Sequence, residues 1–155
     1  MKVHNGSYFC DVNLESKIME AWNLSHDLNL LNQAMLDFCK SREVAIKILD
    51  GIIEIYEVRM NLLDNDYQNI FLALKNKGLT EIEEWNDLYL GCYNIIADLR
   101  VLSYYMNDKN KSMTTDELSN AILGLETLTN VKFELLFDKF QENFKYLHQV
   151  IVFEN

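Results

Sequence analysis

The absence of proline is the feature that most constrains the fold of this 155-residue chain. Proline lacks a backbone N–H and breaks the interior of a helix, so no residue here is forced to interrupt helical structure. Apolar side chains recur at steps of three and four residues along most of the sequence, which is the spacing of one helical face. Together these features predict an all-α protein.

The apolar spacing and the end signals predict four long helices, at about residues 14–39, 42–76, 81–106 and 115–148. In the first helix the spacing of the apolar residues changes phase near residues 23–25, where we expect a break. Ser41 introduces the second helix, and Gly78 ends it in a position where a left-handed cap is common. Lys75 and Lys77 precede this glycine, where cations favour the negative end of the helix dipole.

Two capping boxes mark the starts of the third and fourth predicted helices. In this motif a hydroxyl and a carboxylate three residues apart each satisfy a free backbone N–H. Thr80 with Glu83 fits it, and so does Thr114 with Glu117. Around the second box, Met113 and Leu118 stand at the two positions of a hydrophobic staple.

Short connections between long helices predict an antiparallel four-helix bundle that forms one domain over residues 1–155, with short terminal extensions. The apolar tail at 150–153 has two interpretations: it docks on the bundle, or it pairs as a strand with residues 8–10. Gly51, Gly91 and Gly124 fall inside helices, where glycine costs about 1 kcal/mol relative to alanine. We attribute them to close helix crossings.

Composition places the chain among folded soluble proteins, with 49% hydrophobic and 25% charged residues. The sequence lacks an apolar run long enough for a membrane span, and residues 1–12 do not resemble a signal peptide. We therefore expect a cytoplasmic protein that does not bind membranes. Cys10, Cys39 and Cys92 are widely spaced and odd in number, which favours free, mostly buried thiols.

Known catalytic and metal-binding patterns are not found. His4, His26 and His148 do not follow a glutamate at the spacing of a di-iron bundle, and we expect the last two at surface or boundary positions. Residues 64–75 resemble the start of an EF-hand loop but lack its glycine and its final glutamate. The adjacent residues 25–27 (Ser-His-Asp) point in different directions on a helix and cannot form a triad. We expect no enzyme activity, no metal and no cofactor.

The net charge of −10 is concentrated in the middle of the chain. Residues 50–98 hold three Lys/Arg against ten Asp/Glu, a balance of −7. Direct binding of nucleic acid is not expected, because it needs clustered Lys and Arg to displace counterions from the phosphates.

Two acidic stripes follow helical spacing, and we predict that they bind a partner. We call them the first acidic stripe (Asp50, Glu54, Glu57 and Asp64) and the second acidic stripe (Glu84, Asp87 and Asp98). On adjacent antiparallel helices they would form two neighbouring rows of carboxylates. Such rows suit a basic protein surface, but they are equally what a solvated helix face needs.

The helix at 42–76 is apolar around most of its circumference. Ile46, Ile53 and Met60 lie opposite a second set of apolar residues, which comprises Ile48, Ile52 and Ile55. We expect the helix to be wholly buried, either by the bundle or by a symmetric homodimer.

These features predict a protein that acts by non-covalent binding. The leading hypothesis is a regulator or inhibitor that docks on a basic, nucleic-acid-binding surface of a partner, of the kind that phages and mobile elements encode. The first alternative is a self-assembling homo-oligomeric module. The second is a bundle that binds a small molecule or a metal, or an enzyme built from residues distant in sequence.

Overall fold

The computed structural model describes residues 14–36, 41–76, 82–108 and 113–153. Within these ranges the chain is helical apart from short connections, and it contains no strand. The helical elements follow one another as residues 14–22, α2 (Leu24–Leu36), α3 (Arg42–Asn76), α4 (Ile82–Tyr93), α5 (Ile95–Asn107) and α6 (Thr115–Phe153).

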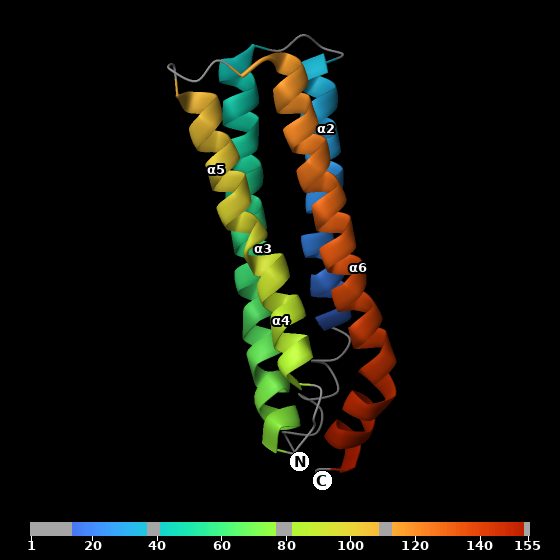
Figure 1. Ribbon diagram of the computed structural model, residues 1–155. Helices are drawn as coiled ribbons and strands as arrows, with labels where there is room; N and C mark the ends of the chain where they lie inside the picture. The colour runs from blue at the N-terminus through green and yellow to red at the C-terminus, as the bar shows by residue number, and fades with distance from the viewer. Residues whose placement is uncertain (1–13, 37–40, 77–81, 109–112, 154–155) are drawn as a thin grey trace.

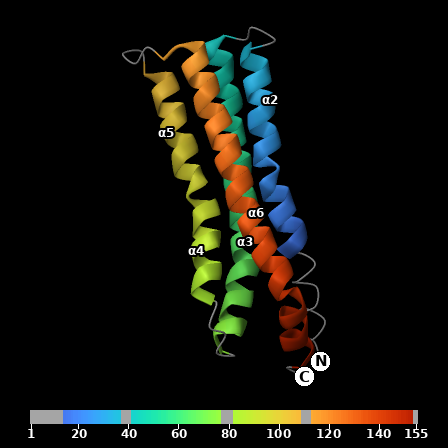
Figure 2. The same ribbon diagram turned by 45° about the vertical axis from the view of Figure 1, so that its right-hand side comes forward.

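The described elements make four antiparallel rods (Figure 1). Residues 14–22 and α2 form the first rod, α3 the second, α4 and α5 the third, and α6 the fourth. α3 packs against α2 and against α4 and α5, and α6 packs against the same three helices. α3 and α6 are therefore diagonal, and in Figure 2 they lie between α2 and α5. The predicted all-α four-helix bundle is confirmed.

Two of the four rods are interrupted at an asparagine. At Asn23 the backbone N–H bonds to the carbonyl of Glu20, 3.2 Å away, and at Asn94 the carbonyl accepts from the N–H of Ala97 at 3.1 Å. Both bonds span three residues, as in a 3₁₀ turn, and so tighten the helix locally. The break near residue 23 was predicted, whereas the break at Asn94 was not.

The predicted hydroxyl caps are present at the two helix starts where the structure describes the cap residue. Ser41 Oγ accepts from the N–H of Val44 at 3.3 Å, and α3 begins at the next residue, Arg42. Thr114 Oγ1 accepts from the N–H of Glu117 at 3.1 Å, and α6 begins at Thr115. The proposed cap residues at 77–80 lie outside the described residues.

Both residues of the predicted hydrophobic staple before α6 pack into the core. Leu118 is buried in the core, and Met113 is partly buried against it. Apolar side chains from all four rods fill this core, and its largest fully buried members are Trp85, Tyr56, Phe133 and Phe140. Between the first and fourth rods, Trp22 Nε1 donates to Asn130 Oδ1 at 3.0 Å.

The bundle does not bury the whole of α3, so the first of the two alternatives for this helix is wrong, and burial by a homodimer stays a prediction. Ile52, Ile53 and Met60 are buried, and Ile46 packs against the core. Ile48 and Ile55, by contrast, are among the exposed large apolar side chains. The neighbouring rods reach α3 on two sides only, so one side of its apolar surface stays uncovered.

Two further expectations are corrected. A Cβ added at Gly51 or Gly124 would meet nothing within 4 Å, and at Gly91 it would only touch the Lys132 stem at 3.9 Å, so close helix crossings do not explain these glycines. α6 continues to Phe153, which rules out a strand at residues 150–153. The docking alternative concerns side chains that the structure does not describe.

Candidate functional site

The first acidic stripe lies along the seam between α3 and the third rod, where three of its four carboxylates have partners. Their positions are seven residues apart, so they face the same neighbour. The three contacts are Ser103 Oγ to Asp50 Oδ1 at 2.7 Å, Arg100 to Glu57 Oε2 at 2.8 Å, and Tyr89 Oη to Asp64 Oδ1 at 2.6 Å. These carboxylates fasten two rods together rather than standing free.

Glu54 is the exception in this stripe. It lies on the outward face of α3, and no partner for it is found among the described residues.

The second acidic stripe runs along the opposite side of the third rod, where α4 and α5 meet α6. Lys139 Nζ pairs with Glu84 Oε2 at 3.0 Å, and Lys132 Nζ donates to the carbonyl of Gly91 at 3.1 Å. The two lysines are seven residues apart on α6, and their acceptors are seven apart on α4. The antiparallel helices therefore meet in regular layers, and each of these layers holds a lysine from α6.

The next layer breaks this pattern. Seven residues beyond Gly91 stands Asp98, and seven residues before Lys132 stands Leu125. Asp98 is exposed, and no cation pairs with it among the described residues. In the two preceding layers α6 supplies a lysine to an oxygen of the third rod. In this layer the third rod has a carboxylate, but α6 supplies an aliphatic side chain.

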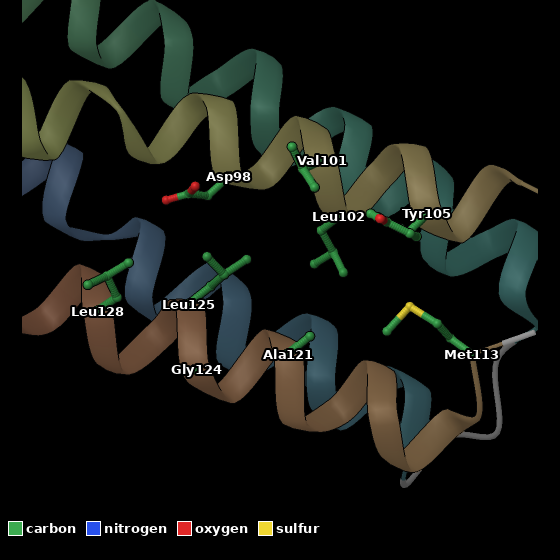
Figure 3. A pocket seen from close by; sticks show the side chains of 9 residues that line it. All are labelled: Asp98, Val101, Leu102, Tyr105, Met113, Ala121, Gly124, Leu125 and Leu128. Carbon is green, nitrogen blue, oxygen red and sulfur yellow. The ribbon is translucent and has the colours of Figure 1, made fainter. Parts of the chain in front are cut away.

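Asp98 and Leu125 both line a groove of about 450 Å³ between α5 and α6. Figure 3 shows the α5 side chains on one wall and those of α6, with Met113, on the other. Apart from Asp98 and the hydroxyl of Tyr105, the side chains that line it are apolar: Val101, Leu102, Met113, Ala121, Leu125 and Leu128, with Gly124 adding none.

The groove exists because α6 carries small residues here. Ala121 and Gly124 are one turn apart, and a Cβ at Gly124 would meet only open space. Leu102 is buried at the floor, whereas Val101 and Leu128 are exposed along the rim. The result is an open apolar trough with a single carboxylate.

The predicted site residues do not form one surface. The first acidic stripe lies on α3 and meets one side of the third rod, whereas Glu84 and Asp98 of the second stripe lie on the other side of that rod, beside α6. Asp87 is exposed, and its charge helps to raise the pKa of Tyr67, while Glu84 is exposed and paired with Lys139. Of the seven carboxylates, only Asp98 lines the α5–α6 groove, which the sequence alone did not reveal.

Lys139 is a second feature that sequence reasoning missed. Only 6% of this residue is exposed, and its Nζ also lies 3.9 Å from Glu142 Oε2. A buried ammonium needs such partners, because an unpaired charge in the interior is costly. The seven-residue spacing of Lys132 and Lys139 was the available signal.

The buried titratable groups near the core are poorly suited to chemistry. Burial raises the pKa of the Cys92 thiol to about 12, and the nearby Lys132 offsets this only in part. Tyr56 Oη donates to the Cys92 carbonyl at 2.5 Å, and burial raises the pKa of this phenol well above its ordinary value. Cys92 is a free, buried thiol as predicted; Cys10 and Cys39 lie outside the described residues.

Within the described part of the chain, no group of three or more His, Cys, Asp or Glu is arranged to hold a metal ion. His26 is exposed, as expected. None of the described helices combines the length and hydropathy that a bilayer crossing requires. No protein-family model, curated protein or solved structure matches this chain.

Proposed function

We propose that this protein acts by non-covalent binding to another protein, as a regulator or inhibitor that docks on a basic surface of its partner. One observation carries the proposal: Asp98 lines the groove seven residues beyond Gly91, and among the described residues no lysine or arginine pairs with it as Lys139 pairs with Glu84. A Lys or Arg side chain from a partner completes the layer of Asp98, and charge-assisted contacts of this kind are among the stronger hydrogen bonds.

The shape of the groove supports an amphipathic partner segment. Its volume of about 450 Å³ fits a few side chains, and its rim is apolar on both helices. A helix that carries leucine or phenylalanine beside one basic residue buries the apolar part in the trough and brings its cation to Asp98.

The remaining carboxylates contribute through their field rather than through contact. The net charge of −10 attracts a basic surface and speeds its encounter, even where a carboxylate is already paired. Surfaces that bind nucleic acid are rich in Lys and Arg, so they are suitable targets. The self-association considered from the sequence uses α3 instead, and it leaves the groove free.

The test is to supply the missing cation within the chain. Leu125→Lys places an ammonium opposite Asp98 and fills the trough, so the partner that wild-type protein captures from the source organism should bind at least tenfold more weakly. Leu123→Lys is the matched control, since it makes the same change on an exposed part of α6 outside the groove. Asp98→Asn should also weaken binding and reduce its dependence on salt.

Isothermal titration of the identified partner against the four proteins measures these effects, with circular dichroism to verify folding. Equal affinity of Leu125→Lys and Leu123→Lys would contradict the proposal. If the captured molecule is instead a small organic cation, the groove serves as a ligand site, and the alternative of a bundle that binds a small molecule replaces the leading hypothesis.

A further inference from the structure

α3 exposes a continuous apolar stripe on the side that the other rods leave uncovered. It comprises Val44, Ile48, Gly51, Ile55, Val58 and Leu62, which we call the α3 stripe. The residues are spaced alternately by four and three, so they lie along one face of the helix. The five apolar side chains are between 36% and 59% exposed. Such a face fits another helix, because heptad spacing matches the surface of a helical neighbour.

The four apolar residues of this stripe nearest to Gly51 follow the same order in both directions, whereas Leu62 has no counterpart. Ile48 and Ile55 lie three and four residues from it, and Val44 and Val58 both lie seven residues from it. In a two-fold symmetric interface, residue i contacts residue j of the partner and j contacts i. An antiparallel pair of α3 helices centred on Gly51 would therefore place isoleucine against isoleucine and valine against valine.

The charges beside the stripe are complementary in the same arrangement. Lys47 stands four residues before Gly51, and Glu54 stands three residues after it. They are seven residues apart and thus on the same flank of the stripe. In the antiparallel pair, Lys47 of each copy lies next to Glu54 of the other. In a parallel pair, Lys47 would instead lie level with Lys47 of the other copy, and Glu54 with Glu54.

Gly51 allows the two helices to approach closely. Nothing lies within 4 Å of the position of a Cβ there, so the bundle itself does not require a glycine. Glycine costs about 1 kcal/mol in a helix interior. A crossing point between two copies explains why glycine stands at position 51, whereas the packing of a single chain does not.

We propose that two copies of this chain associate through α3, antiparallel and centred on Gly51, with the α3 stripe as the interface. The occupant is a second copy because the residue order, the flanking charges and the central glycine are all self-complementary. The surface is separate from the α5–α6 groove, so the dimer can exist whether or not the groove binds a partner.

Sedimentation equilibrium of the full chain at increasing concentration tests the association. We expect a monomer–dimer equilibrium that Ile55→Lys weakens at least tenfold. Leu72→Lys is the control, because Leu72 is also exposed on α3 but lies outside the stripe. A chain that stays monomeric at millimolar concentration, or a dimer that Ile55→Lys leaves intact, would overturn the proposal.

Charge reversal tests the pairing of the flanks. Lys47→Glu and Glu54→Lys should each weaken the dimer severalfold, and the double variant should restore it. Both residues are exposed, so the helical circular dichroism signal of each variant should not change. Failure of the double variant to recover would contradict the arrangement of these charges.

Cysteine cross-linking tests the direction of the pair, in a chain with serine at positions 10 and 39 and with the buried Cys92 retained. Val44→Cys mixed with Val58→Cys should form a disulfide between the two chains. Val44→Cys alone should not, because its two copies would be about 21 Å apart along an antiparallel pair. A disulfide formed by Val44→Cys alone indicates a parallel pair and refutes the proposal.

Discussion

The two halves of the third rod meet α6 in contrasting ways. Beside α4, aromatic rings fill the space: Trp85 lies 6.4 Å from Phe140 and 6.1 Å from Tyr67, measured between ring centroids. Beside α5, the facing residues of α6 are small or aliphatic, and a groove remains. The aromatic residues Tyr104 and Tyr105 of α5 are exposed, so they do not fill this space. The floor of the groove is aliphatic.

This contrast arises although the seven-residue spacing along the third rod continues from one half to the other. Glu84 and Gly91 contact Lys139 and Lys132 of α6, respectively, whereas Asp98, seven residues beyond Gly91, lines the groove. Side-chain size and charge within a layer therefore decide whether the helices close or leave a binding surface. Rings and lysines close the α4 half, whereas Ala121 and Gly124 open the α5 half.

The largest expected effect comes from alkali, and it should act on the closed half. Burial raises the pKa of Tyr56, Tyr67, Tyr89 and Cys92 above the values of an unfolded chain. The unfolded state then loses protons near pH 9–10 while the folded state keeps them. Stability is therefore complete below about pH 9 and falls as pH rises further, by up to about 1.4 kcal/mol per pH unit for each group.

Urea unfolding at pH 7, 9, 10 and 11 measures this loss. Hydrogen exchange should show α4 opening before α5. A free energy of unfolding that stays constant from pH 8 to 11 would contradict the burial of these groups.

Removal of a ring from the closed half should cost more than removal of a leucine from the rim of the groove. Trp85 is 1% exposed, so Trp85→Ala should lower the free energy of unfolding by about 3–5 kcal/mol. Leu128 is 36% exposed, and Leu128→Ala should cost less than about 1 kcal/mol. Chemical denaturation compares them; similar losses would mean that both halves are equally well packed.

Substitution of the groove glycine should stabilise the protein slightly. Gly124→Ala adds a Cβ in open space and improves helix propensity, so the free energy of unfolding should rise by up to about 1 kcal/mol. Gly91→Ala in the closed half is the companion variant, since its Cβ would touch the Lys132 stem. Thermal melts measure both. A destabilised Gly124→Ala would show that α5 and α6 approach each other more closely than described.

The smallest effect is expected at the exposed ion pair between Glu57 and Arg100. Both side chains are accessible, and such pairs contribute about 0.2–1 kcal/mol. Arg100→Ala should therefore shift the urea midpoint only slightly, and the shift should shrink in 1 M salt. A loss comparable with that of Trp85→Ala would show that this seam is more important than packing.

Much of the fold could be predicted because its signals are local. Ser41 and Thr114 cap helices that begin at the following residue, and the change of apolar phase near Asn23 coincides with a real break. No change of apolar phase marks the break at Asn94, because Cys92, Ile95 and Leu99 keep their helical spacing across it. A tightened turn that preserves the apolar face cannot be seen in the pattern.

The candidate site was harder to predict because it depends on which helices meet. Spacing placed Asp50, Glu57 and Asp64 on one face, but it did not show that this face meets the third rod. The significance of Asp98 appears only when α4 and α5 are aligned with α6, so that Lys132 and Lys139 define the layers. That alignment follows from tertiary packing, which no local pattern contains.

The length of α6 has a consequence for how this protein behaves in solution. Its 39 residues span about 58 Å at 1.5 Å per residue, whereas a compact chain of 155 residues has a radius of gyration of only about 15 Å. An elongated particle diffuses more slowly than a sphere of equal mass. A single copy should therefore elute early from a gel-filtration column, with the apparent mass of a larger globular protein.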